Sequence, residues 1–214
     1  MSKSFFVDTT LCTACRGCQV ACKQWHDLPA EETENRGSYQ NPEDLSFDTY
    51  KLVRMEEEII EGRVQWLFFP DQCRHCVEPP CQDTAGDPSA IFTDPASGAV
   101  IYTANTKGLN ADEIIESCPY NIPRKGEDGT LAKCDMCLDR VQNGLQPACV
   151  TTCPTGAMNF GDREDMLALA KKRLSMTREK FPQAQLLDPE DVRVIFMVGY
   201  DPALYHENAV AANS

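Results

Sequence analysis

The chain has 214 residues, a formal net charge of −13 and 12 cysteines. The acidic balance argues against nucleic acid and acidic membrane surfaces as partners, because such partners bind basic faces. Leu, Ile, Val and Phe make up about a fifth of the residues, close to the level at which a highly charged chain stays disordered. The sequence therefore predicts a thin apolar core and a fold held by something besides apolar burial.

The predicted elements, in chain order, are short strands that alternate with long polar loops. Strands are expected at 5–7, 50–56, 64–69, 90–102 (a hairpin), 157–160 and 192–198. Glu61-Gly62 would form the turn of the hairpin 50–69, and residues 94–98 the turn of the next one. Residues 27–49 are acidic and polar, which indicates a surface loop. Asp162 is expected to cap a helix that continues to about Lys180.

The sequence contains no motif that would itself perform substrate chemistry. It has no G-x-G-x-x-G, no P-loop and no G-x-S-x-G, and its 3 histidines lie far apart. No apolar run approaches the ~20 residues that span a bilayer. The N-terminus lacks the apolar segment of a secretory signal. We expect no transmembrane segment and no signal of the chain's own.

The cysteines fall into groups. The groups are Cys12, Cys15, Cys18 and Cys22; Cys73, Cys76 and Cys81; Cys118; and Cys134, Cys137, Cys149 and Cys153. The first has the C-x2-C-x2-C-x3-C spacing of bacterial ferredoxins, in which the fourth cysteine ligates the other cluster of a two-cluster unit. Tetrahedral zinc uses two C-x2-C pairs, which four cysteines within eleven residues do not form. The spacing therefore predicts 4Fe-4S clusters.

An exchange of the fourth cysteine between groups assigns every cysteine to one of three 4Fe-4S clusters. The assignments are Cys12, Cys15, Cys18 and Cys153 for cluster 1; Cys22, Cys134, Cys137 and Cys149 for cluster 2; and Cys73, Cys76, Cys81 and Cys118 for cluster 3. The equivalent ligands of a fourth cluster would fall at Ala85, Gly108, Ala111 and Ile114. None of these is cysteine, so one whole site is missing.

This pattern predicts an α+β fold of duplicated bacterial-ferredoxin-like units with long loops and little regular secondary structure. The bound clusters would cross-link the loops and stabilise the fold. Residues 1–26 with 130–161 would form a first unit with two clusters, and 50–129 a second unit with one cluster. Residues 27–49 would be an acidic loop. Residues 162–214 would be a helix–strand extension for packing or subunit contact.

Four side chains beside the cysteines carry separate expectations. His75 is expected to be an ordinary loop histidine, because 12 cysteines suffice for three clusters. Lys133 is either solvated or raises a cluster potential through its charge. Trp25 and His26 are expected to pack locally; the alternatives are that they tune the neighbouring cluster or line the partner interface. The runs Glu31-Glu32 and Glu56–Glu58 are solvated faces or a docking patch for a basic cytochrome.

At the level of motifs, the chain resembles the four-cluster iron–sulfur electron-transfer subunits of molybdopterin oxidoreductases. The resemblance covers about residues 4–161 and rests on the segments Cys118–Arg124, Lys133–Cys137 and Cys149–Ala157. Within that group, the missing cluster site, the missing membrane helix and the segment Cys12–His26 look like the small subunit of soluble formate dehydrogenases from sulfate-reducing bacteria.

The resemblance implies a heterodimer with a large catalytic subunit that carries tungsten or molybdenum on bis-pyranopterin guanine dinucleotide and a further 4Fe-4S cluster. Formate would be oxidised on that subunit, and this chain would pass the electrons through its three clusters to a multihaem c-type cytochrome. A periplasmic location is implied, with export of the folded pair on the partner's twin-arginine signal; a cytoplasmic location is the alternative. The alternative functions are another molybdopterin oxidoreductase subunit, acting on sulfur compounds, nitrogen oxides or sulfoxides, and a zinc- or cluster-stapled interaction module.

Overall fold

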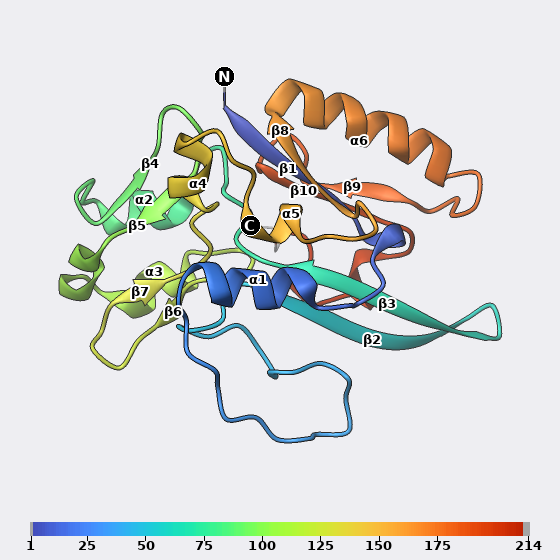
Figure 1. Ribbon diagram of the computed structural model, residues 1–214, viewed down its shortest axis with the longest axis horizontal. Helices are drawn as coiled ribbons and strands as arrows, with labels where there is room; N and C mark the ends of the chain where they lie inside the picture. The colour runs from blue at the N-terminus through green and yellow to red at the C-terminus, as the bar shows by residue number, and fades with distance from the viewer. Residues whose placement is uncertain (1, 212–214) are drawn as a thin grey trace.

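The computed structural model describes residues 2–211 and is built around one small sheet (Figure 1). Its strands are β1 (Lys3–Asp8), β8 (Met158–Asp162), β9 (Gln185–Leu187) and β10 (Val194–Val198), in the order β8-β1-β10-β9. β1 pairs antiparallel with β8 and parallel with β10. The first strand of the chain therefore lies between two strands that come more than 140 residues later.

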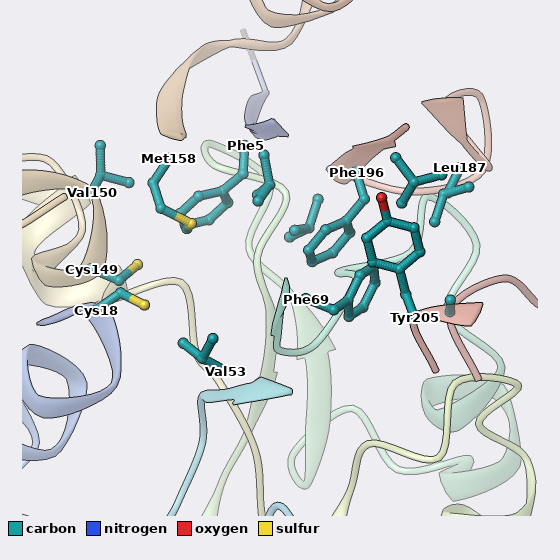
Figure 2. Close-up of a cluster of buried hydrophobic side chains, with 14 of the residues drawn as sticks. Phe5, Cys18, Val53, Phe69, Cys149, Val150, Met158, Leu187, Phe196 and Tyr205 are labelled. Carbon is teal, nitrogen blue, oxygen red and sulfur yellow. The ribbon is translucent and has the colours of Figure 1, made fainter. Parts of the chain in front are cut away.

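Both faces of this sheet are buried. All five residues of β10 are inaccessible to solvent, which explains its unbroken apolar sequence Val-Ile-Phe-Met-Val. One face packs on α6 (Arg163–Thr177), where Ala170 meets Phe6, Ile195 and Met197. The opposite face carries a stack of Phe69 on Phe196, with ring centroids 4.3 Å apart. Figure 2 shows this apolar core group extending from the aromatic stack to Cys18 and Cys149.

The remaining strands form three separate hairpins. They are β2 (Leu52–Ile60) with β3 (Arg63–Asp71), β4 (Ile91–Thr93) with β5 (Val100–Tyr102), and β6 (Arg124–Lys125) with β7 (Leu131–Ala132). The two predicted hairpins are confirmed, as are the strands predicted at 5–7, 157–160 and 192–198. In Figure 1 the β2–β3 hairpin projects from the body of the molecule.

The helices other than α6 are short. They are α1 (Gly17–Trp25), α2 (Pro80–Ala85), α3 (Ala111–Glu116), α4 (Leu138–Gln142) and α5 (Ala148–Thr151), with 3-10 turns at Thr9–Leu11, Ala104–Gly108 and Pro202–Leu204. Helix α6 follows Asp162 as predicted, but the Asp162 carboxylate pairs with Lys3 Nζ at 2.7 Å and makes no capping bond. It ends at Thr177, a turn earlier than expected.

Residues 27–49 form the predicted loop, in which the only regular pairing is a bridge between Ser46 and Thr49. Within residues 2–211, no helix is long and apolar enough to cross a membrane. Cysteines belong to each of the apolar core groups: Cys18 and Cys149, Cys73 and Cys134, and Cys81. The core and the cysteine sites are thus continuous, and the core is not an independent scaffold.

Candidate metal centres

Three small cavities of similar size are each lined by four cysteines. Site 1 contains Cys12, Cys15, Cys18 and Cys153; site 2 contains Cys22, Cys134, Cys137 and Cys149; site 3 contains Cys73, Cys76, Cys81 and Cys118. Measured out to their openings, the cavities have volumes of about 320, 270 and 340 Å³ respectively. Each cavity brings together the four cysteines that were assigned to one cluster from the sequence. Cys22 and Cys153, the fourth cysteines of the first and last groups, each lie with the cysteines of the other group.

Site 1 is formed by the loop between β1 and α1 and by the residue pair that follows α5. Ala14 and Arg16 adopt positive φ angles of 52° and 59°, which turn the loop back on itself. Cys18 is buried in the first turn of α1, whereas Cys15 is exposed. Burial raises the pKa of Cys12 to about 11. Of the 12 cysteines of the three sites, only Cys15 is exposed rather than buried or half-buried.

Site 2 is the most enclosed, since all four of its cysteines are buried. Helix α1 packs against α5, and this contact places Cys22 near Cys149. Positive φ angles at Met136 and Cys137 bend the chain between β7 and α4. Burial and then neighbouring thiolates raise the pKa values of Cys22 and Cys134 well above the ordinary value.

Site 3 is formed by the end of β3, helix α2 and the turn after α3. The backbone N–H of His75 donates to Cys73 Sγ at 3.4 Å, and the N–H of Met136 donates in the same way to Cys134 Sγ of site 2 at 3.5 Å. Burial raises the pKa of Cys76 to about 12 and that of Cys118 to about 11. Such N–H donors stabilise thiolates, whereas burial opposes their ionisation.

The donor set fits an iron–sulfur cluster. Four convergent thiols in an apolar cavity would remain protonated without a cation, because burial disfavours thiolate. Among the described residues, Tyr102 Oη and Arg74 Nη2 at site 3 and Gln72 Nε2 at site 2 are buried without a hydrogen-bond partner. Cluster sulfides and thiolates accept such bonds, so these orphaned donors match a sulfur-rich occupant.

Two buried lysines line or flank these cavities. Lys133 Nζ donates to the carbonyls of Val100 and Cys134, so the solvated alternative for this residue is wrong. Lys51 Nζ donates to the Pro70 carbonyl and to Gln72 Oε1. The sequence reasoning missed Lys51. The sequence feature that could have indicated its burial is a single lysine directly before the apolar residues Leu52 and Val53.

The histidines near the cysteines have structural roles. His75 lies in a loop, as expected, but it is fully buried and does not line site 3. Its Nδ1 accepts a hydrogen bond from the N–H of Val100 at 3.0 Å. His26 Nε2 contacts Asp135 at 3.0 Å beside Cys137. Because Cys137 belongs to site 2, these three groups do not form a separate metal site.

Trp25 makes the expected local contacts, but 42% of its surface stays exposed. The Arg140 guanidinium lies 4.1 Å from the ring centroid of Trp25, and the indole N–H donates to Asp139. These contacts join α1 to α4 beside site 2.

The cysteine-lined cavities and their ferredoxin-type loops define a 4Fe-4S protein. Residues 64–163 match the 4Fe-4S dicluster domain family. Over 99% of its length and 100% of the relative, the chain is 61% identical to "Formate dehydrogenase subunit beta" of Megalodesulfovibrio gigas. It is 53% identical to "Formate dehydrogenase 2 subunit beta (cytochrome c-553)" of Nitratidesulfovibrio vulgaris, with 98% and 99% covered. The chain belongs to the family of formate dehydrogenase beta, or iron–sulfur, subunits.

A more distant relative is longer than this chain. The "Formate dehydrogenase, nitrate-inducible, iron-sulfur subunit" of Escherichia coli is 36% identical over 94% of this chain but only 70% of its own length. The beta subunits of Megalodesulfovibrio gigas and Nitratidesulfovibrio vulgaris, in contrast, match almost end to end.

Proposed function

We propose that this chain is the electron-transfer subunit of a formate dehydrogenase and that sites 1, 2 and 3 each hold one 4Fe-4S cluster. The observation that carries the proposal is the set of three similar cavities, each lined by four cysteines. When bound, such a cluster accepts and releases one electron at a time. The chain's residues supply the thiolate ligands and exclude water from them.

The sites follow one another in the order 1, 2, 3. Cys18 of site 1 and Cys149 of site 2 belong to one group of packed buried side chains. Cys73 of site 3 and Cys134 of site 2 belong to another. Site 2 therefore connects the other two, and an electron would pass through it between an entry and an exit site.

The cluster count is tested by chemical analysis. The purified complex is expected to show about 12 irons and about 12 acid-labile sulfides attributable to this chain, from three 4Fe-4S clusters. The visible absorbance should bleach on reduction with dithionite. About three zinc ions and no sulfide would overturn the proposal in favour of a zinc-stapled module.

The ligand assignment is tested by Cys22→Ser and Cys153→Ser. Cys22 and Cys153 lie in cavities lined by cysteines from the opposite group, which supports the exchanged pairing. Each variant should alter the electron paramagnetic resonance signal of a different cluster, Cys153→Ser that of site 1 and Cys22→Ser that of site 2. Identical spectral losses in the two variants would contradict the assignment.

We also infer two ferredoxin-like units, 1–26 with 130–161 and 50–129. Support comes from the cysteines of sites 1 and 2, which all belong to the first unit, and those of site 3, which all belong to the second. The residues after 162 provide β9 and β10, so the extension is part of the central sheet.

The partners follow from the family. We propose a large molybdopterin subunit with tungsten or molybdenum as the electron donor, and a c-type cytochrome, multihaem in our expectation, as the acceptor. The Nitratidesulfovibrio vulgaris relative carries cytochrome c-553 in its name, which supports this class of acceptor. We further propose a periplasmic location after export with the partner. Co-purification of the large subunit, with metal analysis and cell fractionation, tests these points.

A further inference from the structure

Lys51 and Lys133 are the buried lysines of the described chain, with 2% and 7% of their surfaces exposed. Lysine is rarely buried without a carboxylate partner, because its ammonium group loses strong hydration. Neither residue forms an ion pair with a carboxylate in residues 2–211. Their hydrogen bonds all go to neutral oxygens, those of Pro70, Gln72, Val100 and Cys134. Two uncompensated positive charges thus lie inside the protein.

Lys51 lies between sites 1 and 2. Of its two hydrogen-bond acceptors, Pro70 lines site 1 and Gln72 lines site 2. Burial alone would lower the pKa of Lys51, yet thiolates from both sites raise it above its ordinary value. These thiolates are Cys18 of site 1 and Cys149, Cys134 and Cys22 of site 2.

Lys133 occupies the equivalent position between sites 2 and 3. It lines site 3, and its Nζ donates to the carbonyl of Cys134, a cysteine of site 2. The ammonium also lies 4.7 Å from the ring centroid of Tyr102, another residue of the site 3 wall. Each step along the series of sites therefore contains one buried ammonium group.

We propose that Lys51 and Lys133 are permanent counter-cations, each shared by two neighbouring clusters and each favouring the reduced state of both. The inference rests on the proposed function. A 4Fe-4S core with four thiolates carries a net charge of about −2 when oxidised and about −3 after it accepts one electron. The electron comes from the catalytic partner, and no proton has to move. A nearby fixed cation stabilises the more negative state in a water-poor interior.

Arg74 shows the contrasting case. This residue also lines site 3 and is 2% exposed, but its guanidinium pairs with the Asp71 carboxylate at 2.8 Å. Arg74 thus has a carboxylate hydrogen-bond partner, whereas neither Lys51 nor Lys133 has one. Site 2 contacts both lysines and is expected to depend on them most.

The test replaces each lysine with methionine, which keeps the chain length and apolar stem but removes the charge. Lys51→Met and Lys133→Met are made in the heterodimer with its catalytic subunit, and the clusters are titrated with dithionite under electron paramagnetic resonance. We expect at least a tenfold fall in the reduction equilibrium constant, or about 59 mV for a one-electron couple. The fall should affect clusters 1 and 2 in Lys51→Met, and clusters 2 and 3 in Lys133→Met.

Two control variants test whether an effect on the potentials comes from the charge of the buried lysine, from its packing, or from the loss of any lysine. Lys51→Arg keeps the positive charge and should retain potentials near those of the unmodified protein. Lys107→Met removes a lysine whose side chain is 60% exposed, and should shift no cluster. The signals of individual clusters are assigned with the cysteine-to-serine variants of each site.

The outcomes distinguish this inference from the proposed function. Full iron content with unchanged potentials in both methionine variants overturns the role of the lysines, as does an equal shift of all three clusters. If Lys51→Met loses iron while Lys51→Arg keeps it, the charge is required and the inference stands. If both lose iron, the side chain acts through packing and the inference fails. An unmodified chain with well under about 12 irons overturns the proposed function itself.

Discussion

His75 is an ionisable residue that the fold keeps neutral. It stands between Cys73 and Cys76 with a φ angle of 47°, and its ring is wholly inaccessible to solvent. Burial, reinforced by the charges of Lys133 and Arg193, holds the pKa of His75 well below its usual range. The imidazole instead fixes β5 to the cysteine loop through the N–H of Val100.

This neutrality predicts sensitivity to mild acid. The unfolded chain binds a proton at His75 below about pH 6.5 and the folded chain does not, so stability falls as the pH drops through that value. His75→Asn, which tolerates positive φ and can still accept from Val100, should remove most of this slope; His206, whose pKa is also lowered, retains the rest.

The measurement is the guanidinium midpoint for loss of visible cluster absorbance, compared at about pH 5 and about pH 7 in both proteins. Equal pH dependence of the two midpoints would contradict the role assigned to His75.

Asp71 supports a buried charge network on the same loop. Its carboxylate, fully buried, accepts from Arg54 Nε and Arg74 Nη1, each at 2.8 Å. Asp71→Asn would leave the Arg74 guanidinium buried without a counter-charge, at an expected cost of about 3–5 kcal/mol. The midpoint of unfolding in guanidinium chloride measures this loss of stability. A cost below about 1 kcal/mol would show that the network is dispensable.

At the scale of elements, β10 determines the shape of the core. It is buried on both faces and lies between β1 and β9, while α6 covers one side of the sheet. The stack of Phe196 on Phe69 joins the sheet to the β2–β3 hairpin. Lys51 immediately precedes this hairpin, and Asp71 is its last residue. Rigid placement of the hairpin thus fixes one wall of sites 1 and 2.

Removal of the stack should therefore destabilise both the sheet and the sites. Phe196→Ala is expected to cost about 3–5 kcal/mol, and Phe196→Leu clearly less, because leucine refills part of the cavity. Faster cluster loss in guanidinium, with Phe196→Leu intermediate, is the expected result. Equal rates for the alanine variant and the unmodified protein would contradict a coupling between core and sites.

Two of the three hairpins and most strands of the central sheet could be predicted from apolar runs and turn residues, because those signals are local; the short strand β9 and the two-residue strands β6 and β7 carry too little signal and were not predicted. The cysteine groups could be predicted for the same reason, since ferredoxin spacing is a property of one loop. The parallel pairing of β1 with β10 could not, because strands so distant in sequence carry no mark of their register. The burial of Lys51, Lys133 and His75 also escaped prediction, since polar residues near loops are usually solvated.

At the scale of the whole molecule, the protein is strongly acidic, with a formal net charge of −13 before any cluster is counted. Bound clusters with their thiolates would add about −6 in the oxidised state. Glu56 and Glu57 of β2 are exposed on the projecting hairpin and Glu58 is half-buried, as expected for either a solvated face or a docking patch.

The negative charge of the protein should therefore attract a basic c-type cytochrome, and the ionic strength sets the range of this attraction. The rate of electron transfer to such a cytochrome is expected to fall at least severalfold between about 0.05 and 0.5 M salt, because screening shortens the attraction. Transfer to a small uncharged acceptor serves as the control and should change little. A salt-independent rate with the cytochrome would exclude electrostatic docking.

The pairing of β1 with β10 has a consequence for biogenesis. Residues 194–198 are made more than 180 residues after β1, yet they complete the hydrogen-bonding of that strand, which leads directly to Cys12. In the nascent chain β1 therefore lacks one partner strand until β10 has been made, and Cys12 lacks one cysteine of its own site until Cys153 has been made. The last cysteine of site 3, Cys118, is made before the last cysteine of site 1, so the site that begins first in the sequence is not the first whose ligand set is complete.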